Sequence, residues 1–108
     1  MPTLREKPTL DEFQKYVSEL ERERGFERQD ILKKCLLLGE EVGELFKAVR
    51  NQERMSVDAS AAISSVEEEL ADVLIMLCAV ANRSDVSLER AFRRKEERNK
   101  QRTWTREP

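Results

Sequence analysis

The run from Val73 to Ala81 constrains the fold more than any other feature of the chain, because every residue in it is apolar. The segment before it has the form of a capping box at Ser65, which predicts that a helix begins there and continues through the run. A helix that is apolar all round must be covered on all sides. Three neighbouring helices of one 108-residue chain could just cover it, but we favour a homo-oligomer in which a second copy completes the bundle.

The remainder of the sequence also favours helix, since it has only three Gly and three Pro among 108 residues. Three more helices have recognisable starts. A capping box at Thr9 opens a helix that should end at Gly25, Asp30 opens one that should end near Asn51, and Ser87 opens the last. We therefore predict an all-α fold built as a four-helix bundle.

The predicted helices form a single domain, residues 1–108, with a loose tail at 1–8, a second tail at 105–108 and a polar loop at 51–63. The net charge of −2 gives no reason to expect nucleic acid or an anionic membrane as a partner. No signal peptide is recognisable and no apolar run is long enough to span a bilayer, so the cytoplasm is the expected location. Cys35 and Cys78 fall in apolar helical pattern and are expected in the core.

Two groups of acids lie within apolar sequence in the second and third predicted helices. Glu40, Glu41 and Glu44 fall within an arc of about 100° on one helix. Glu69 and Asp72 lie one turn apart on the other. The first group by itself could be a solvated stripe of charge, so the interpretation depends on the second.

Asp72 is the carboxylate that makes a solvated stripe hard to accept, because it stands where the apolar run begins and we expect it to be buried. No basic residue occurs in its predicted helix before Arg83. A buried carboxylate needs a cation, a metal or a proton, and converging carboxylates repel by roughly 4 kcal/mol per close pair at an effective dielectric of 20. The chain has no histidine, which leaves oxygen ligands and a hard ion, Mg²⁺ or Mn²⁺.

The last predicted helix changes character along its inward face. Leu88, Ala91 and Phe92 begin an apolar stripe, and the same helical phase continues into donors of hydrogen bonds. These donors are Lys95, Asn99 and Arg102. They could be a frayed, exposed helix end, but beside an acidic cluster they suit phosphate oxygens. Trp104 follows, and we expect it to pack on the core rather than stack on a base.

The order and spacing of these motifs resemble a known family. Glu-Glu-x-x-Glu at Glu40, Glu41 and Glu44, followed by Glu-x-x-Asp at Glu69 and Asp72, resembles the signature of the MazG-type all-α nucleotide pyrophosphohydrolases. Within that family the chain resembles the short single-domain members, including the dCTP pyrophosphatases, and the likeness covers roughly residues 10–104. Its ending, Lys95-x-x-x-Asn99-x-x-Arg102-x-Trp104, is similar to their Lys-x-x-x-Asn-x-x-Arg-x-Tyr.

The resemblance implies helical bundles, assembled as dimers or tetramers, that cleave nucleoside triphosphates to monophosphates and pyrophosphate with Mg²⁺. It implies a metal site formed by Glu41, Glu44, Glu69 and Asp72. Glu40 would support those ligands, bind a second metal or orient the water, and either Glu40 or Glu41 would accept the water's proton. Lys95, Asn99 and Arg102 would bind phosphates, and the biological role would be removal of non-standard nucleotides.

This resemblance does not identify which nucleobase the substrate carries. The dCTP-preferring enzymes have aromatic residues around the base where this chain has Asn51 and Met76. Other aromatic residues could contact a base, and they are Phe13, Tyr16, Phe26 and Trp104. Two alternatives also remain: a phosphoribosyl-ATP pyrophosphohydrolase, whose family has similar acids, and a helical interaction module in which the acids are only a solvated stripe.

Overall fold

A computed structural model describes residues 1–55, 58–60 and 63–107, and within these ranges it contains four helices and no strand. They are α1 (Leu10–Arg24), α2 (Ile31–Gln52), α3 (Val66–Arg83) and α4 (Leu88–Asn99). The prediction of an all-α fold with four helices is therefore confirmed. Parts of the predicted loop at 51–63 lie outside the described residues.

Each helix begins at the residue that the sequence predicted. Thr9 forms a reciprocal capping box with Glu12, with N–H to oxygen distances of 3.0 and 3.1 Å. Asp30, Ser65 and Ser87 each accept a hydrogen bond from a backbone N–H in the first turn of the helix that follows. A glycine ends α1 in the left-handed region, at φ 77° for Gly25, where a side chain would be strained.

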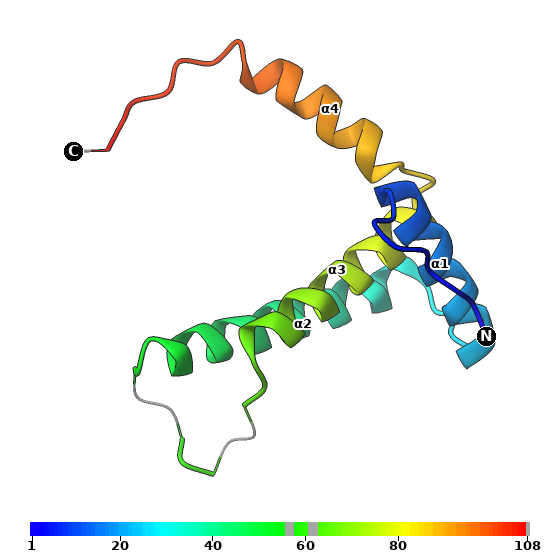
Figure 1. The fold of residues 1–108 in the computed structure, drawn as a ribbon, viewed down its shortest axis with the longest axis horizontal. Helices are drawn as coiled ribbons and strands as arrows, with labels where there is room; N and C mark the ends of the chain where they lie inside the picture. Colours follow the sequence, from blue (N-terminus) through cyan, green and yellow to red (C-terminus); the bar gives the residue numbers. More distant parts are fainter. Residues whose placement is uncertain (56–57, 61–62, 108) are drawn as a thin grey trace.

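The helices meet at one end of the molecule. Figure 1 shows α2 and α3 side by side and antiparallel, with α1 crossing the end where α3 finishes. The buried core lies at this crossing, where Val17 of α1 meets Cys78 and Ala79 of α3. Phe13, Leu74, Ile75 and Leu88 pack around it. The core therefore holds α1 against α3, while the acid groups lie farther along the α2–α3 pair.

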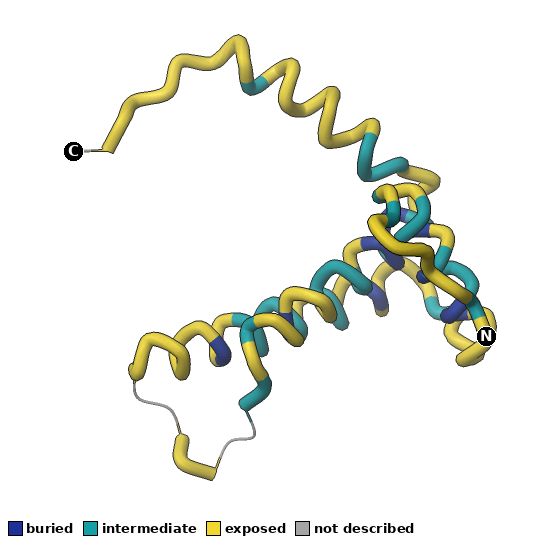
Figure 2. The backbone as a smooth tube through the Cα atoms, in the orientation of Figure 1, coloured by how far each residue is buried: buried dark blue, intermediate teal, exposed yellow. Residues whose placement is uncertain are grey.

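Helix α4 does not face inward as the sequence predicted. It packs mainly against α1, and its start is tied there by Gln14, whose Oε1 accepts the Leu88 N–H at 2.8 Å. Beyond that point it diverges from α2 and α3 (Figure 1) and is almost wholly exposed (Figure 2). Ala91 is exposed and Phe92 is 67% exposed, because no other helix in the described ranges covers that face of α4.

Other residues expected in the core are also exposed. Trp104 is 65% exposed, and Leu77, in the apolar run, is 40% exposed. Cys78 is buried as expected, but Cys35 is exposed. The physical reason is the same in each case, since four helices of one chain leave faces of α2, α3 and α4 uncovered. No helix in the described ranges has both the length and the apolar character needed to cross a membrane.

Candidate active site

The acids of α2 and α3 converge where the two helices run side by side. Glu41 projects from α2, and Glu69 and Asp72 project from α3 one turn apart. One carboxylate oxygen from each lies within 4.8 Å of those of the other two. This arrangement follows from the sequence, because the i, i+3 spacing places Glu69 and Asp72 on the same face of α3. The structure thus brings together three of the four predicted metal ligands.

Glu69 is the buried member of this cluster, with 5% of its surface exposed. Its Oε1 accepts a hydrogen bond from the Ser64 hydroxyl. Its Oε2 is buried, and no donor among the described residues reaches it. The expectation of a buried Asp72 is wrong, since Asp72 is exposed. The argument that a buried carboxylate needs a cation therefore applies to Glu69.

The charges of the cluster act on Glu41. Burial raises the pKa of the Glu41 carboxyl, and the negative charges of Asp72, Glu69 and Glu44 raise it further. Glu44 thus lies close enough to add repulsion, although its own carboxylate is outside the close group of three and pairs with Lys47 at 3.5 Å. Glu40, which together with Glu41 was predicted as a candidate to accept the water's proton, is exposed beside Glu41 on α2. The site accumulates negative charge with no buried cation to balance it among the residues described.

These residues fit a hard divalent ion. They supply only carboxylate oxygens, which are the ligands that Mg²⁺ and Mn²⁺ prefer. The Oε2 atom of Glu69 is an acceptor without a donor, and such a buried group is costly unless something binds it. The structure therefore contains an acidic cluster suited to a metal ion, with Glu41, Glu69 and Asp72 as its close members.

The three predicted phosphate ligands lie on the last part of α4 and the segment after it. Lys95 is exposed, and Asn99 is half-buried with its Nδ2 donating to Glu96 at 3.1 Å. The Arg102 guanidinium lies over the Trp104 ring, 4.6 Å from its centroid, and the indole N–H donates to the Asn99 carbonyl at 3.1 Å. Asn99, Arg102 and Trp104 thus contact one another, but this segment lies apart from α2 and α3 in Figure 1.

Comparisons with known proteins agree with this geometry. Residues 28–106 match the MazG nucleotide pyrophosphohydrolase domain, a segment that includes every acid of the cluster. The chain belongs to the MazG family. It is a nucleotide pyrophosphohydrolase by this membership.

Solved structures support the same assignment. The chain is similar to the Ntag and Ctag forms of iMazG from Vibrio DAT 722, with 32% sequence identity and a TM-score of 0.62 in each case. The likeness covers 85% of this chain and 94% or 98% of the two neighbours. No curated protein sequence matches this chain.

The four aromatic residues that were possible base contacts of this MazG domain do not lie together. Phe13 packs against the core. Trp104 is on the C-terminal segment. Phe26, in the link between α1 and α2, lines a cavity of about 130 Å³ enclosed by α1, α2 and α3. Tyr16 lines other hollows, next to Leu4. Of the four aromatics, only Phe26 lines this cavity, whose walls include Leu37 of α2 and Met76 of α3.

Sequence reasoning missed a buried ion network at the wall of this cavity. Glu21 of α1 is 5% exposed. Both of its oxygens accept hydrogen bonds from Arg83, at 2.9 and 2.8 Å, and Lys34 Nζ lies 3.0 Å from one of them. Burial alone would raise the pKa of Glu21, but the hydrogen bonds from Arg83 and Lys34 outweigh it and the pKa is lowered.

Arg83 extends this network to the backbone between α1 and α2. Its Nε donates to the Gln29 carbonyl at 2.6 Å, and its other nitrogens reach the carbonyls of Phe26 at 3.1 Å and Ala79 at 2.9 Å. The available signal was Arg83 as the first basic residue after the apolar run, but its partners outside α3 lie 54 to 62 positions away in sequence. No local pattern identifies such partners.

Proposed function

We propose that this chain is a Mg²⁺-dependent nucleoside triphosphate pyrophosphohydrolase that converts a ribo- or deoxyribonucleoside triphosphate and water to the monophosphate and pyrophosphate. The observation that carries the proposal is the convergence of Glu41, Glu69 and Asp72 within 4.8 Å, with one buried oxygen of Glu69 lacking a donor among described residues. Family membership supports the reaction class. Mn²⁺ is the expected substitute ion.

Glu41, Glu69 and Asp72 would hold the ion, and Glu44 would join them. The Glu44–Lys47 pair is 43% and 50% exposed, and an exposed pair of this kind contributes only about 0–1 kcal/mol. Little stability is therefore lost when Glu44 leaves Lys47 to bind a divalent ion. The Ser64 hydroxyl holds the other oxygen of Glu69, which fixes the direction in which Oε2 points.

The chemistry follows from the charges at the site. A bound divalent ion would offset the repulsion between the carboxylates and the triphosphate and lower the pKa of a water molecule beside them. Glu40 or Glu41 accepts a proton from the attacking water. The water oxygen bonds to the α-phosphorus, the bridge from the α- to the β-phosphate breaks, and pyrophosphate leaves. No histidine is needed for this sequence of events.

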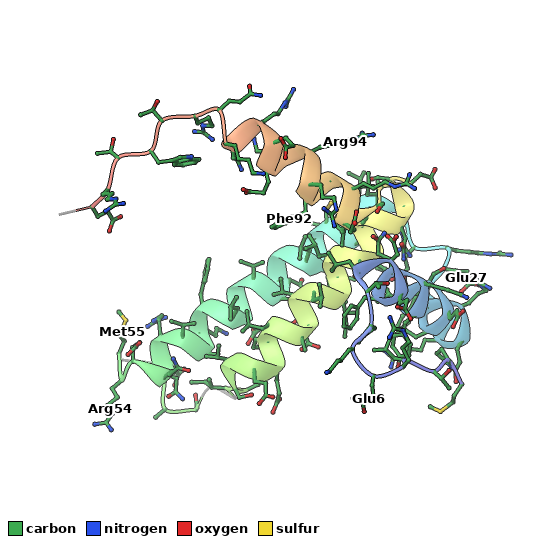
Figure 3. The ribbon with its side chains drawn as sticks, turned by 45° about the horizontal axis from the view of Figure 1, so that its top comes forward. Glu6, Glu27, Arg54, Met55, Phe92 and Arg94 are labelled. Atoms are coloured by element: carbon green, nitrogen blue, oxygen red, sulfur yellow. The ribbon has the colours of Figure 1, made fainter. Side chains whose placement is uncertain are left out.

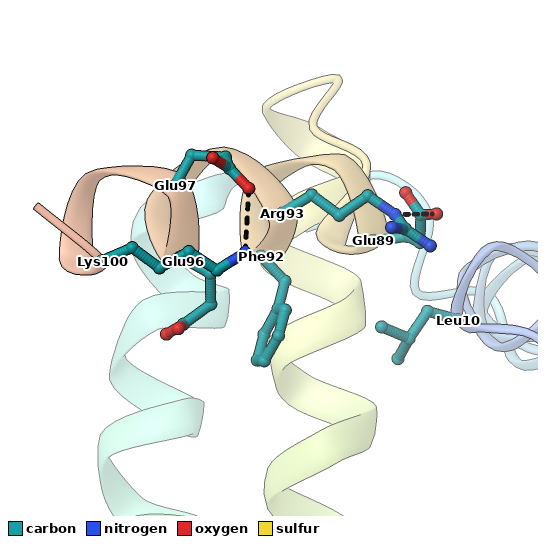
Figure 4. A pocket seen from close by; sticks show the side chains of 7 residues that line it. All are labelled: Leu10, Glu89, Phe92, Arg93, Glu96, Glu97 and Lys100. Carbon is teal, nitrogen blue, oxygen red and sulfur yellow. Dashed lines mark hydrogen bonds and ion pairs between the residues drawn. The ribbon is translucent and has the colours of Figure 1, made fainter.

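Phosphate binding by Lys95, Asn99 and Arg102 requires a second copy of the chain under this proposal. These residues lie on a segment that diverges from the acids of the same chain (Figure 1). The side of α4 nearest Leu10 borders a hollow of about 620 Å³ (Figure 4), where the pair between Glu97 and Lys100 lies at 3.1 Å. Phe92 projects from α4 (Figure 3) and is among the side chains bordering the hollow. An exposed aromatic of this kind suits a homo-oligomer, a dimer or a tetramer.

The reaction class is tested by pyrophosphate release from a panel of triphosphates, including modified bases and phosphoribosyl-ATP, with Mg²⁺, with Mn²⁺ and with EDTA. We expect metal-dependent release of monophosphate and pyrophosphate. Preference for modified bases would support a role in removing non-standard nucleotides. Cleavage of phosphoribosyl-ATP alone would assign the enzyme to histidine synthesis. No turnover, together with no effect of metal on stability, would contradict the proposal.

Sharing of the site between copies is tested by mixing two inactive variants, Asp72→Asn and Lys95→Ala, after mild dissociation. If acids and phosphate ligands come from different copies, mixed oligomers regain intact sites, and about a quarter of wild-type activity should return for a randomly mixed dimer. Glu68→Gln, an exposed acid outside the cluster, serves as the active control. A mixture that stays inactive while native mass spectrometry shows mixed oligomers would place both groups in the same copy.

A further inference from the structure

A serine contacts the acidic cluster from outside both acidic motifs. Ser64 lies two residues before Val66, the first residue of α3, and its hydroxyl donates a hydrogen bond to Glu69 Oε1. Glu69 is the buried acid of the cluster, with 5% of its surface exposed. The serine therefore bears on which ion the cluster accepts, and its role rests on the metal-dependent function proposed above.

The two side-chain oxygens of Glu69 have different surroundings. Oε1 already accepts the proton of the Ser64 hydroxyl, since an ionised carboxylate can only accept. Oε2 is buried, and no donor among the described residues reaches it. A buried acceptor without a partner is costly, so Oε2 is the oxygen that most needs a cation.

The start of α3 fixes the serine relative to the acid. Ser65 is the N-cap residue, and its hydroxyl accepts the Glu68 N–H at 3.1 Å. The Ser65 carbonyl accepts the Glu69 N–H, also at 3.1 Å. These two bonds tie the backbone next to Ser64 to the backbone that carries Glu69. The hydroxyl is thus held on a rigid element, as discrimination between ligands requires.

Glu69 is also the acid of the cluster that is least free to turn. Among the three close members, Glu41 is half-buried and Asp72 is exposed, whereas Glu69 is buried. An exposed carboxylate can rotate to offer an ion one oxygen or two. A buried carboxylate with a hydroxyl on one oxygen offers mainly the other. The manner in which Glu69 binds an ion is therefore set by the protein rather than by the ion.

Divalent ions differ in how they use a carboxylate. Mg²⁺ requires nearly ideal octahedral geometry, whereas Ca²⁺ takes about six to eight oxygen ligands and often both oxygens of one carboxylate. An ion that used both oxygens of Glu69 would lie against the hydroxyl proton that Ser64 directs at Oε1. The serine therefore opposes the two-oxygen mode that Ca²⁺ favours and leaves the one-oxygen mode that suits Mg²⁺.

We propose that Ser64 determines the ion specificity of this site. By occupying Oε1 of Glu69, its hydroxyl makes Glu69 a one-oxygen ligand through Oε2 and shifts the selectivity of the cluster from Ca²⁺ toward Mg²⁺. Ser64 does not touch the ion itself, so it is a positioning residue. Groups that orient metal ligands in this way typically change metal affinity by about 10- to 100-fold when they are removed.

The test is calorimetric titration of the wild type and Ser64→Ala with Mg²⁺ and, separately, with Ca²⁺. The decisive quantity is the ratio of the Kd for Ca²⁺ to the Kd for Mg²⁺. Ser64→Ala should weaken Mg²⁺ binding by about tenfold or more and leave Ca²⁺ binding unchanged or tighter, because both oxygens of Glu69 become available. The ratio should therefore fall by at least about tenfold.

Two further variants separate positioning from a general effect on the fold. Ser64→Thr keeps the hydroxyl and should keep the ratio. Ser65→Ala removes the neighbouring hydroxyl, which caps α3 through Glu68 and should lower the melting temperature without changing the ratio. A general loosening of the site would weaken both ions alike, so the ratio reports the placement of the Glu69 oxygens rather than stability.

The outcomes distinguish this inference from the proposed reaction. A ratio that falls in Ser64→Ala and is kept in Ser64→Thr and Ser65→Ala supports the assignment. A Mg²⁺-dependent enzyme whose ratio is unchanged in Ser64→Ala overturns it and leaves the reaction class intact. An equal fall in Ser65→Ala also overturns it, because the effect would then belong to the start of the helix. If neither ion binds the wild type, the proposed function itself is contradicted.

Discussion

Two glutamates of this molecule are equally buried and have opposite surroundings. Glu21 and Glu69 are each 5% exposed. Glu21 has two cations of its own chain, Arg83 and Lys34, within 3.0 Å. Glu69 has a hydroxyl on one oxygen, no donor from the described residues on the other, and acids as neighbours. A buried carboxylate with an internal cation holds the fold together, whereas one that lacks it marks a place for a cation from outside.

The same substitution at the two positions gives the strongest test of this comparison. Glu21→Gln leaves Arg83 and Lys34 buried without their anion, and breaking a buried ion pair by removing one partner costs about 3–5 kcal/mol. Urea denaturation should show this loss in the free energy of unfolding. Glu23→Gln, at an exposed position on the same helix, should stay within about 0.5 kcal/mol. A loss below about 1 kcal/mol at Glu21 would mean that the network contributes little.

Glu69→Gln should behave in the opposite way when no metal is present. It removes a negative charge beside Glu41 and Asp72, and its amide can donate to them, so unfolding should become no easier. What it should lose is the response to Mg²⁺, which stabilises a metal-binding protein by about 2.7 kcal/mol at a concentration 100 times the Kd. Thermal melting with and without Mg²⁺ measures this. An undiminished response in Glu69→Gln would exclude Glu69 as a ligand.

The comparison also predicts how stability depends on pH. The pKa of Glu21 is lowered from its ordinary value of 4.5, so the folded state holds its proton less tightly than the unfolded chain. Its contribution to stability is present above pH 4.5 and is lost as the pH falls through the lower folded value. Urea midpoints between pH 7 and 3 should therefore converge for the wild type and Glu21→Gln on the acid side. If the difference in urea midpoint between the wild type and Glu21→Gln stayed constant with pH, the stability would come from packing instead.

The sequence was sufficient for the parts of this molecule that depend on local chemistry. Helix starts at Thr9, Asp30, Ser65 and Ser87 follow from capping residues, which act within three positions of themselves. The convergence of the acids was predictable once two helices were assumed to pack, because helical spacing fixes the face on which each acid lies.

Features that depend on contacts distant in sequence were not predictable in the same way. The partner of Arg83 on α1 lies 62 positions away. The phase of the stripe through Leu88 and Phe92 predicted an inward face for α4, but Ala91 and Phe92 of that stripe are exposed in the single chain. The helical period determines which residues share a face of a helix, whereas the burial of that face depends on where the neighbouring helix lies.

Glu44 provides the smallest and last test, because its situation is intermediate between the two buried glutamates. Its cation, Lys47, is 50% exposed and 3.5 Å away, so the pair should contribute less than about 0.5 kcal/mol to stability. We therefore expect Lys47→Ala to leave the free energy of unfolding nearly unchanged and to tighten Mg²⁺ binding, since it removes a competitor for Glu44. Calorimetric titration with Mg²⁺ measures the change, with Lys33→Ala, another exposed lysine of α2, as the control. Weaker Mg²⁺ binding in Lys47→Ala alone would mean that Lys47 positions Glu44, and that an exposed cation too can be part of the site.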